Sequence, residues 1–422
     1  MALRDMERDM AGCSRCSSCK WIPHSQVKSW RFASGCPSST RHHFHAYSGS
    51  GKMIMGLSLL HGRSELNDGV AEIIYNCQLC GSCQVSCQVY RDDIDLSDVL
   101  LELRGKCVED GFLILEHMEM LQSMKKEDNP LGMLKADRGR WAEGLDVPDI
   151  GQRQVEVLFH AGCRYSYDED LRETLRETIS LLSGSGVDIG IAGREEACCG
   201  GRAYELGYQG EMRNFADDMA GRVKASGAAI LVTACSDCYY TFKYLYPKRG
   251  LDLGVEVLHV TELVGRMIKE GRIEPAGDVP MRVTYHDPCH LGRRGETYKA
   301  GWDGGDKLQR PVRFKQSGRM GVFDPPRDII RALPGAELVE MERIREYSWC
   351  CGAGGGVLEA FPDFAAWTAA DRLEEAAATG AEALVTACPW CVRIFRDTVT
   401  ETGVEMKVYD VMELLSASLG GV

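Results

Sequence analysis

Two adjacent cysteines, Cys350 and Cys351, stand in the stretch EYSWCCGAGGG, directly before a run of glycines. Neighbouring cysteines rarely bond to each other, because the ring that they would close is strained, and free thiols are prone to oxidation. The chain carries 19 cysteines in 422 residues. Disulfide scaffolds are typical of short secreted domains, so we interpret the cysteines of this long chain as metal ligands.

Two motifs near the N-terminus have the spacing of ferredoxin cluster ligands. Residues 77–87, CQLCGSCQVSC, follow the pattern C-x2-C-x2-C-x3-C, and residues 13–19, CSRCSSC, repeat its first part. The distant fourth cysteine of the earlier motif is Cys36, which precedes Pro37. In two-cluster ferredoxins the last cysteine of a motif binds the other cluster. The spacing therefore predicts one [4Fe–4S] cluster on Cys13, Cys16, Cys19 and Cys87, and another on Cys36, Cys77, Cys80 and Cys83.

A pair of structural zinc sites is the alternative interpretation of these motifs. Zinc is typically held by two C-x2-C pairs, which leaves the three-plus-one arrangement unexplained. The spacing therefore favours iron–sulfur clusters. One departure bears on the assignment of Cys36: sixteen residues separate it from Cys19, where the second motif has three.

Apolar residues recur at helical spacing over 52–76 and 94–124, which predicts helices around the two clusters. Cys107 lies in the second of these segments and belongs to no motif, so core packing is the simpler role for it. The cluster ligands are complete without the histidines of RHHFHAY, for which we expect a loop or interface role: His42, His43 and His45.

The rest of the chain contains an internal repeat. Four segments recur in the same order: 157–163 and 283–289, 195–201 and 347–356, 228–238 and 381–391, 255–264 and 406–415. Each copy alternates short β-rich runs with helical stretches, which predicts two α/β modules with mostly parallel sheets. In both copies a strand runs into a C-x2-C motif, so we expect these cysteines at the carboxyl edge of the sheet, where the sites of open α/β sheets lie.

Each module offers five cysteines: Cys163, Cys198, Cys199, Cys235 and Cys238 in the first, and Cys289, Cys350, Cys351, Cys388 and Cys391 in the second. Five thiolates exceed what a zinc ion or a cubane cluster takes. An adjacent pair can instead serve two neighbouring irons of a more open cluster, or let one sulfur bridge. Glycines beside the pair let the backbone pass close to inorganic sulfide.

The doubled C…CCG…C-x2-C pattern, preceded by two ferredoxin motifs, resembles the cysteine-rich CCG-domain family and its heterodisulfide reductase D member, which is equivalent to fused C and B subunits. The resemblance covers nearly the whole chain and 18 of the 19 cysteines. It implies that each module binds a noncubane [4Fe–4S] cluster through its five cysteines as catalytic ligands, and that the two clusters together cleave a disulfide. The expected architecture is a helical two-cluster domain (1–150) followed by two α/β CCG modules (151–275 and 276–422).

The second module departs from the first by an insertion. Thirty-four residues separate Cys163 from Cys198, but sixty separate Cys289 from Cys350. The extra segment, near 293–325, is basic in an otherwise acidic chain and carries Arg293, Arg294, Lys299, Lys307, Arg310, Arg313, Lys315 and Arg319. Two interpretations stay open: a solvated loop, or a docking surface for an anion or a partner beside the second noncubane cluster.

Two further stretches, KWIPHSQVKSWRF and FDPPRDIIRALPG, resemble the heterodisulfide-reductase-like subunit of class II benzoyl-CoA reductase complexes. That resemblance implies a place in a larger anaerobic redox complex, of the flavin-based bifurcating kind, beside a flavoprotein resembling heterodisulfide reductase A. The chain shows no G-x-G-x-x-G motif opening a βαβ unit, so we expect no flavin of its own.

Composition excludes several classes of partner. The net charge of −13 argues against nucleic acid, which needs a basic face. The sequence contains no apolar run as long as a membrane span and no secretory signal. We therefore expect a cytoplasmic protein, and we expect any attachment to a membrane to be made through a partner.

The sequence thus predicts an iron–sulfur oxidoreductase subunit, either an electron relay in a complex or a catalytic disulfide reductase, with a zinc-binding structural protein as the alternative class. Four residues flank the cluster cysteines: His286, His290, Asp237 and Trp390. They either tune the potential and deliver protons or simply pack in the core. The insertion, which could cover the substrate gap, favours the relay.

Overall fold

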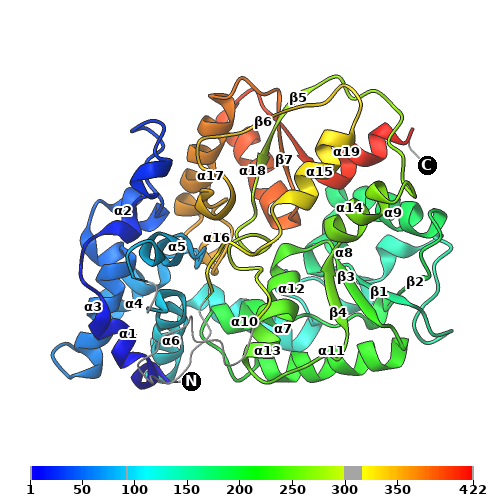
Figure 1. Cartoon of the computed structure of the whole chain (residues 1–422). Coiled ribbons are helices and arrows are strands. Elements are labelled where there is room, and N and C mark those ends of the chain that lie inside the picture. Colours follow the sequence, from blue (N-terminus) through cyan, green and yellow to red (C-terminus); the bar gives the residue numbers. More distant parts are fainter. Residues whose placement is uncertain (1, 92–93, 299–315, 421–422) are drawn as a thin grey trace, which may run out of the picture.

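The computed structural model describes residues 2–91, 94–298 and 316–420. Its N-terminal region is helical, and the helices up to residue 109 occupy one side of the molecule (Figure 1). The helices are α1 (Glu7–Gly12), α2 (Pro37–His42), α3 (Gly49–Leu60), α4 (Asp68–Tyr75), α5 (Ser82–Gln88), α6 (Leu96–Glu109) and α7 (Leu115–Glu127).

Each of the two long helices expected from periodicity is broken in two. The segment expected at 52–76 forms α3 and α4, because Asn67 caps a new helix by accepting a hydrogen bond from the backbone N–H of Val70 at 3.0 Å. The segment expected at 94–124 forms α6 and α7, and Gly111 between them adopts a φ of 82°, which a helix cannot include. Periodicity found the buried faces but not these interruptions.

The first CCG module is built on a four-stranded parallel sheet in the order β2-β1-β3-β4. Its strands are β1 (Val157–His160), β2 (Ile189–Ile191), β3 (Ile230–Thr233) and β4 (Glu256–His259). The helices are α8 (Cys163–Tyr167), α9 (Glu169–Gly184), α10 (Gly201–Glu205), α11 (Met212–Ser226), α12 (Ser236–Tyr240), α13 (Tyr246–Lys248) and α14 (Val260–Lys269).

The second module repeats this topology with the order β6-β5-β7-β8, again all parallel. Its strands are β5 (Arg282–His286), β6 (Glu337–Val339), β7 (Ala383–Thr386) and β8 (Lys407–Asp410). The helices are α15 (Asp324–Ala332), α16 (Val357–Ala360), α17 (Pro362–Ala377), α18 (Pro389–Thr402) and α19 (Val411–Ser418). The expected helical and α/β architecture is confirmed; the exact domain boundaries stay a prediction.

The central strands are apolar and almost fully buried, as expected for parallel strands covered by helices on both faces. The two modules pack on each other through α9, α14, α15 and α19. A fully buried arginine of α6, Arg104, joins all three regions: its guanidinium donates to the backbone oxygens of Cys77 (2.5 Å), Glu205 (2.9 Å) and Gly355 (2.6 Å). Among the described helices we find none with the length and apolar character that crossing a bilayer requires.

Candidate iron–sulfur sites

The outer set consists of the sulfurs of Cys13, Cys16, Cys19 and Cys87. The first three lie on a loop after α1 that includes two left-handed residues, Arg15 and Ser17, and the fourth is carried by α5. Burial first, and then the nearby sulfurs of the other three cysteines of the set, raise the pKa of the Cys87 thiol to about 12. The structure thus places the last cysteine of the second motif beside the first motif.

The inner set consists of the sulfurs of Cys36, Cys77, Cys80 and Cys83. Burial raises the pKa of the Cys36 thiol to about 12, with Lys52 acting in the opposite direction and Cys77 and Cys80 adding to the rise. The pKa of Cys83 is also raised by burial first, and then by the other sulfurs of the inner set. Cys36 therefore lies with the second motif despite the sixteen-residue spacing, an arrangement that agrees with the predicted exchange of ligands between the motifs.

The first CCG set consists of the sulfurs of Cys163, Cys198, Cys199, Cys235 and Cys238, all buried. Cys163 follows β1 at the start of α8, Cys235 and Cys238 follow β3, and the adjacent pair follows β2 and lies just before α10, all at the carboxyl edge of the sheet. Sγ of Cys163 lies 3.8 Å from Sγ of Cys198. Gly162 has a φ of 77°, and a Cβ there would lie 3.2 Å from Sγ of Cys238, so the backbone passes close to the sulfurs where a side chain would be strained.

The second CCG set consists of the sulfurs of Cys289, Cys350, Cys351, Cys388 and Cys391. Here too the cysteines follow strand ends: Cys289 follows β5, Cys388 and Cys391 follow β7, and the adjacent pair comes after the edge strand β6. The thiol of Cys350 contacts those of Cys289 and Cys351, and these contacts raise its pKa well above the ordinary value. A ring nitrogen of His286 and the sulfurs of Cys351 and Cys391 all lie within 4.8 Å of one another.

The sets adjoin one another through cysteines of different regions. Cys80 of the inner set contacts Cys350 of the second CCG set, and Cys388 of that set contacts Cys235 of the first CCG set. The outer set lies on the other side of the inner set, with Cys19 near Cys83. The order is therefore outer set, inner set, second CCG set, first CCG set.

The donor chemistry of these sets fits iron–sulfur clusters. The cysteines bring together four thiols in each ferredoxin-type set and five in each CCG set, and sulfur is the donor that such clusters require. A tetrahedral zinc ion would use four thiols and leave the fifth of each CCG set without a role.

Comparison with known proteins agrees with these motifs. The family model described as "Cysteine-rich domain" matches residues 157–243 and 314–396, and that described as "4Fe-4S dicluster domain" matches 9–90. The D component of the dihydromethanophenazine:CoB–CoM heterodisulfide reductase of Methanosarcina mazei is 30% identical over 99% of this chain and 96% of its own length. The chain belongs to the heterodisulfide reductase D family. It is accordingly an iron–sulfur oxidoreductase subunit.

Other relatives are longer than this member of the heterodisulfide reductase D family. The probable iron–sulfur-binding oxidoreductase FadF of Bacillus subtilis is 29% identical over 89% of the chain, which spans 51% of FadF. The EtfAB:quinone oxidoreductase of Syntrophomonas wolfei is 28% identical over 82% of the chain and 46% of its own length. A solved structure of a hypothetical protein from Helicobacter pylori, 9% identical, shares the fold with a TM-score of 0.55 over 89% of this chain and 67% of its own.

The basic insertion of this heterodisulfide reductase D family member requires a correction. Arg293 and Arg294 are 2% exposed, so they belong neither to a solvated loop nor to an exposed docking surface. Arg293 donates to the backbone oxygens of Cys80 (2.6 Å) and Ser348 (2.5 Å), and Arg294 donates to that of Leu79. Arg319 is exposed, as a solvated residue would be. The remaining basic residues named for this segment lie outside the described residues: Lys299, Lys307, Arg310, Arg313 and Lys315.

A buried polar cluster lies between the two CCG sets. Nδ1 of His290 is 2.5 Å from the carboxylate of Asp237, and its Nε2 is 2.9 Å from that of Glu205. Burial lowers the pKa of His290, but the two carboxylates outweigh it and hold the pKa well above its ordinary value. Arg202 stacks on the ring of Trp390 at 3.9 Å and pairs with Asp237 at 3.1 Å. Sequence reasoning missed Glu205 and Arg202, because neither belongs to a cysteine motif.

The N-terminal histidines make no described hydrogen bond to a cysteine, although the Ser50 that contacts His45 is itself hydrogen-bonded to Cys19. The ring of His42 stacks on Tyr47 at 3.9 Å and meets Phe364 of the second module edge-on at 5.5 Å. Nε2 of His45 is 3.3 Å from the hydroxyl of Ser50, and His43 is exposed. The contact with Phe364 places His42 at the interface between two regions.

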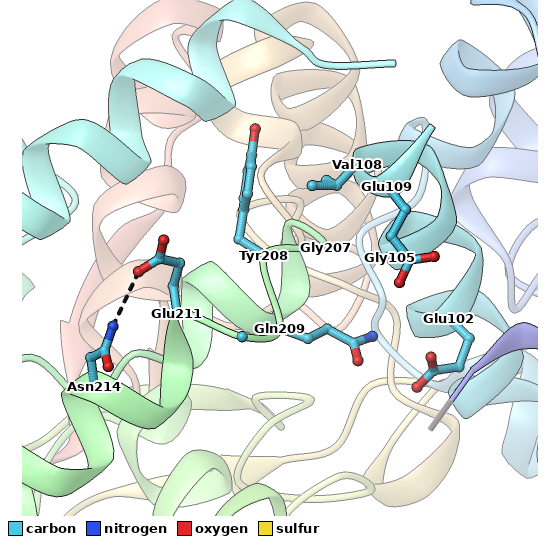
Figure 2. A pocket seen from close by; sticks show the side chains of 10 residues that line it. Glu102, Gly105, Val108, Glu109, Gly207, Tyr208, Gln209, Glu211 and Asn214 are labelled. Atoms are coloured by element: carbon cyan, nitrogen blue, oxygen red, sulfur yellow. Dashed lines mark hydrogen bonds between the residues drawn. The ribbon is translucent and has the colours of Figure 1, made fainter. Parts of the chain in front are cut away.

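A hollow between α6 and the segment 207–214 lies away from the predicted ligands (Figure 2). The described residues that line it include the carboxylates of Glu102, Glu109 and Glu211, and no cysteine. The guanidinium of Arg249 lies 3.2 Å from the Glu102 carboxylate. This hollow is therefore a polar seam between the helical region and the first module rather than a cluster site.

Proposed function

We propose that this chain conducts electrons between a partner subunit and two noncubane clusters within a larger redox complex. In this proposal the outer and inner sets each hold a cubane [4Fe–4S] cluster, and each CCG set holds a noncubane one, so that all eighteen motif cysteines are ligands. The clusters would supply one-electron chemistry, while the chain supplies ligands, burial and hydrogen bonds.

The contact between the sets is the observation that carries the proposal. Because Cys80 contacts Cys350 and Cys388 contacts Cys235, groups held by three successive sets would lie side by side. Cys80, Cys83 and all cysteines of the first CCG set are buried, so the protein excludes water along this route. A structural zinc protein would have no need to place its sites in a continuous row.

The outer set supports a partner docking surface at the start of the row. Cys16 is exposed and lies at the edge of an apolar groove whose lining includes Trp21, Trp30 and Tyr90. These aromatic side chains are 49%, 79% and 61% exposed. Large exposed aromatic groups of this kind are typical of protein interfaces, where tryptophan and tyrosine provide much of the binding energy.

Charge indicates the nature of the partner. Residues 10–64 contain no aspartate or glutamate, although the whole chain has a net charge of −13. Around the groove, Arg15, Lys20 and Lys28 form no ion pair with any residue that the structure describes. We propose that the partner presents an acidic surface here and is a flavoprotein resembling heterodisulfide reductase A, as in complexes of the class II benzoyl-CoA reductase type.

A second candidate function, catalytic disulfide reduction, is favoured by the polar cluster between the CCG sets. Reducing a disulfide to two thiols takes two electrons and two protons. The narrow space lined by Asp237, His290 and Trp390 also borders Cys289 and Cys388, so a proton-bearing histidine lies beside sulfurs of the second CCG set, and Asp237 of the first module faces the same space. This alternative requires that a disulfide enter between the modules.

Metal analysis of anaerobically purified protein tests the proposal. We expect about sixteen iron atoms per chain, from four clusters of four. About eight iron atoms at full occupancy would remove the noncubane assignment, and stoichiometric zinc would support the structural alternative. Turnover of a disulfide by the parent, lost in Cys351→Ala, would favour the catalytic role over the relay.

A further inference from the structure

The two CCG modules place a histidine at the same point, the carboxyl end of the first central strand. His160 ends β1 and His286 ends β5, each three residues before a cysteine of its set. Each ring meets an equivalent phenylalanine edge-on: His160 meets Phe242 at 5.0 Å and 83°, and His286 meets Phe395 at 4.9 Å and 83°. The repeat therefore preserves the position and packing of the ring.

The hydrogen bonding of the two rings differs. Nε of Arg372 lies 3.1 Å from Nδ1 of His286. A guanidinium can only donate, so Nδ1 must accept, and the single ring proton of His286 must be on Nε2. Arg372 is itself held in place by Glu375 (2.6 Å), the backbone oxygen of Arg343 (2.9 Å) and the hydroxyl of Ser348 (3.1 Å).

The ring of His286 faces sulfur. The ring is 1% exposed and contacts the thiol of Cys351, and it lies within 4.8 Å of the sulfurs of both Cys351 and Cys391. Nε2 has no hydrogen-bond partner among the described residues, so its N–H is not taken up by another group of the protein. Arg372 fixes an N–H donor on Nε2 of this ring. Among the described residues, only the sulfurs of the second CCG set therefore remain to accept a hydrogen bond from it.

The first module lacks this arrangement. When Cys235 is aligned with Cys388, the position of Arg372 is taken by Met219, which cannot donate a hydrogen bond. Neither ring nitrogen of His160 has a hydrogen-bond partner among the described residues, and the carboxylate of Glu196 is 3.7 Å from Nδ1. No described residue of the first module therefore fixes the ring proton of His160 on one nitrogen.

We propose that His286 donates its Nε2–H to a sulfur of the second CCG set, and that Arg372 is the positioning residue that fixes this proton. A hydrogen bond to sulfur stabilises the added negative charge of the reduced site, so it raises the potential of the second site relative to the same site without the bond. The two CCG sites then differ in potential, although their ten cysteines match one for one. This inference rests on the proposal that the second CCG set holds a cluster.

Pulsed EPR on anaerobic holoprotein labelled with ¹⁵N-histidine tests the hydrogen bond. We expect a weak ¹⁵N coupling in the paramagnetic state of the second site, absent in His286→Phe and retained in the matched control His160→Phe. A strong coupling would mean that the nitrogen is a direct ligand, and a spectrum unchanged by His286→Phe would mean that no bond exists; either result overturns the proposal. A parent protein with about eight iron atoms and no such site would instead overturn the proposed function.

Redox titration separates tuning from a merely structural role. We expect His286→Phe and Arg372→Met to lower the midpoint potential of the second site, and His286→Gln, which keeps a side-chain N–H, to restore most of the shift. Arg372→Met gives this site the residue found in the first module, so it should also weaken the ¹⁵N coupling. If His286→Phe loses iron, His286→Gln and Arg372→Met still decide the matter, because unchanged potentials in iron-replete Arg372→Met protein would contradict the role of Arg372.

Discussion

The outer and inner cysteine sets share one motif but have opposite surroundings. Cys16 of the outer set is exposed beside the aromatic groove, whereas Cys80 of the inner set is buried and contacts Cys350 of the second module. The same four-thiol chemistry thus faces solvent in one set and another set of sulfurs in the other. Under the proposed function, the ligands decide what is bound, while the surroundings decide from where and to where electrons pass.

Buried arginines create the inward orientation of the inner set. Arg293 and Arg294 of the second module donate to the backbone oxygens of Cys80 and Leu79, and Arg104 donates to that of Cys77. Each of these carbonyls would be costly to bury without a partner. The loop of the inner set is therefore fixed against the second module.

Removing one ligand from the outer set and one from the inner set should give the largest difference between the two sets. We expect Cys16→Ala and Cys80→Ala each to lose about four iron atoms. Only Cys80→Ala should also change the EPR spectrum of the second CCG site, because only Cys80 contacts Cys350. Iron analysis and low-temperature EPR of both variants measure this. Indistinguishable CCG spectra in the two variants would contradict the proposed order of the sets.

Removing an anchoring arginine should loosen the inner set without touching a ligand. Arg293→Met leaves the buried carbonyls of Cys80, Glu346 and Ser348 without their donor, at about 1–3 kcal/mol each, so we expect a loss of about 3 kcal/mol or more. Denaturant unfolding of the holoprotein measures the lost free energy of unfolding, and hydrogen exchange over 77–88 measures the loosening of the loop. Lys126→Met, at a side chain 82% exposed, is the control and should change little. Equal stability of the two variants would argue against the anchor.

Truncating an aromatic side chain of the groove should weaken partner binding beside the outer set and leave the inner set unchanged. We expect Trp30→Ala to weaken binding of the copurifying partner subunit by about 2 kcal/mol, roughly 30-fold in dissociation constant, with iron content unchanged. Leu115→Ala, at an exposed side chain of α7 that does not line the groove, is the matched control. Calorimetric titration of both variants against the partner gives the constants. Equal affinities would place the docking surface elsewhere.

The remaining cysteine of the helical region should show the smallest effect. Cys107 is fully buried in α6 and belongs to neither set. Cys107→Ser should keep all iron and cost about 1 kcal/mol, because a hydroxyl is buried where a thiol packed against apolar groups. Thermal unfolding and iron analysis check both parts. A lost cluster in this variant would show that Cys107 is a ligand after all.

Much of the architecture was predictable because it depends on local patterns. The repeat predicted two parallel α/β modules with cysteines after the central strands, and the sheets have that topology, with Cys235 and Cys388 following β3 and β7. Helix interruptions were not predictable from periodicity. Gly111 and the capping Asn67 lie within otherwise periodic stretches, and the apolar spacing continues across both.

The insertion shows most clearly where sequence reasoning stops. Arg293 and Arg294 stand in a run of basic residues, for which the ordinary expectation is exposure to solvent. Their burial depends on unpaired carbonyls supplied by residues more than 200 positions earlier, at Leu79 and Cys80. No pattern within the insertion could reveal acceptors that come from another region.

Cysteine spacing was enough to identify the candidate ligands and the number of sets that they form, because such spacing is a property of a short stretch of chain. Folding in three dimensions was needed to establish that Cys36 joins the second motif, that the second CCG set lies between the inner set and the first, and that Arg372 fixes the proton of His286. These relations join residues tens to hundreds of positions apart. They depend on how buried faces pack and on where buried polar groups find partners. The spacing of residues within a short stretch of chain carries no information about either.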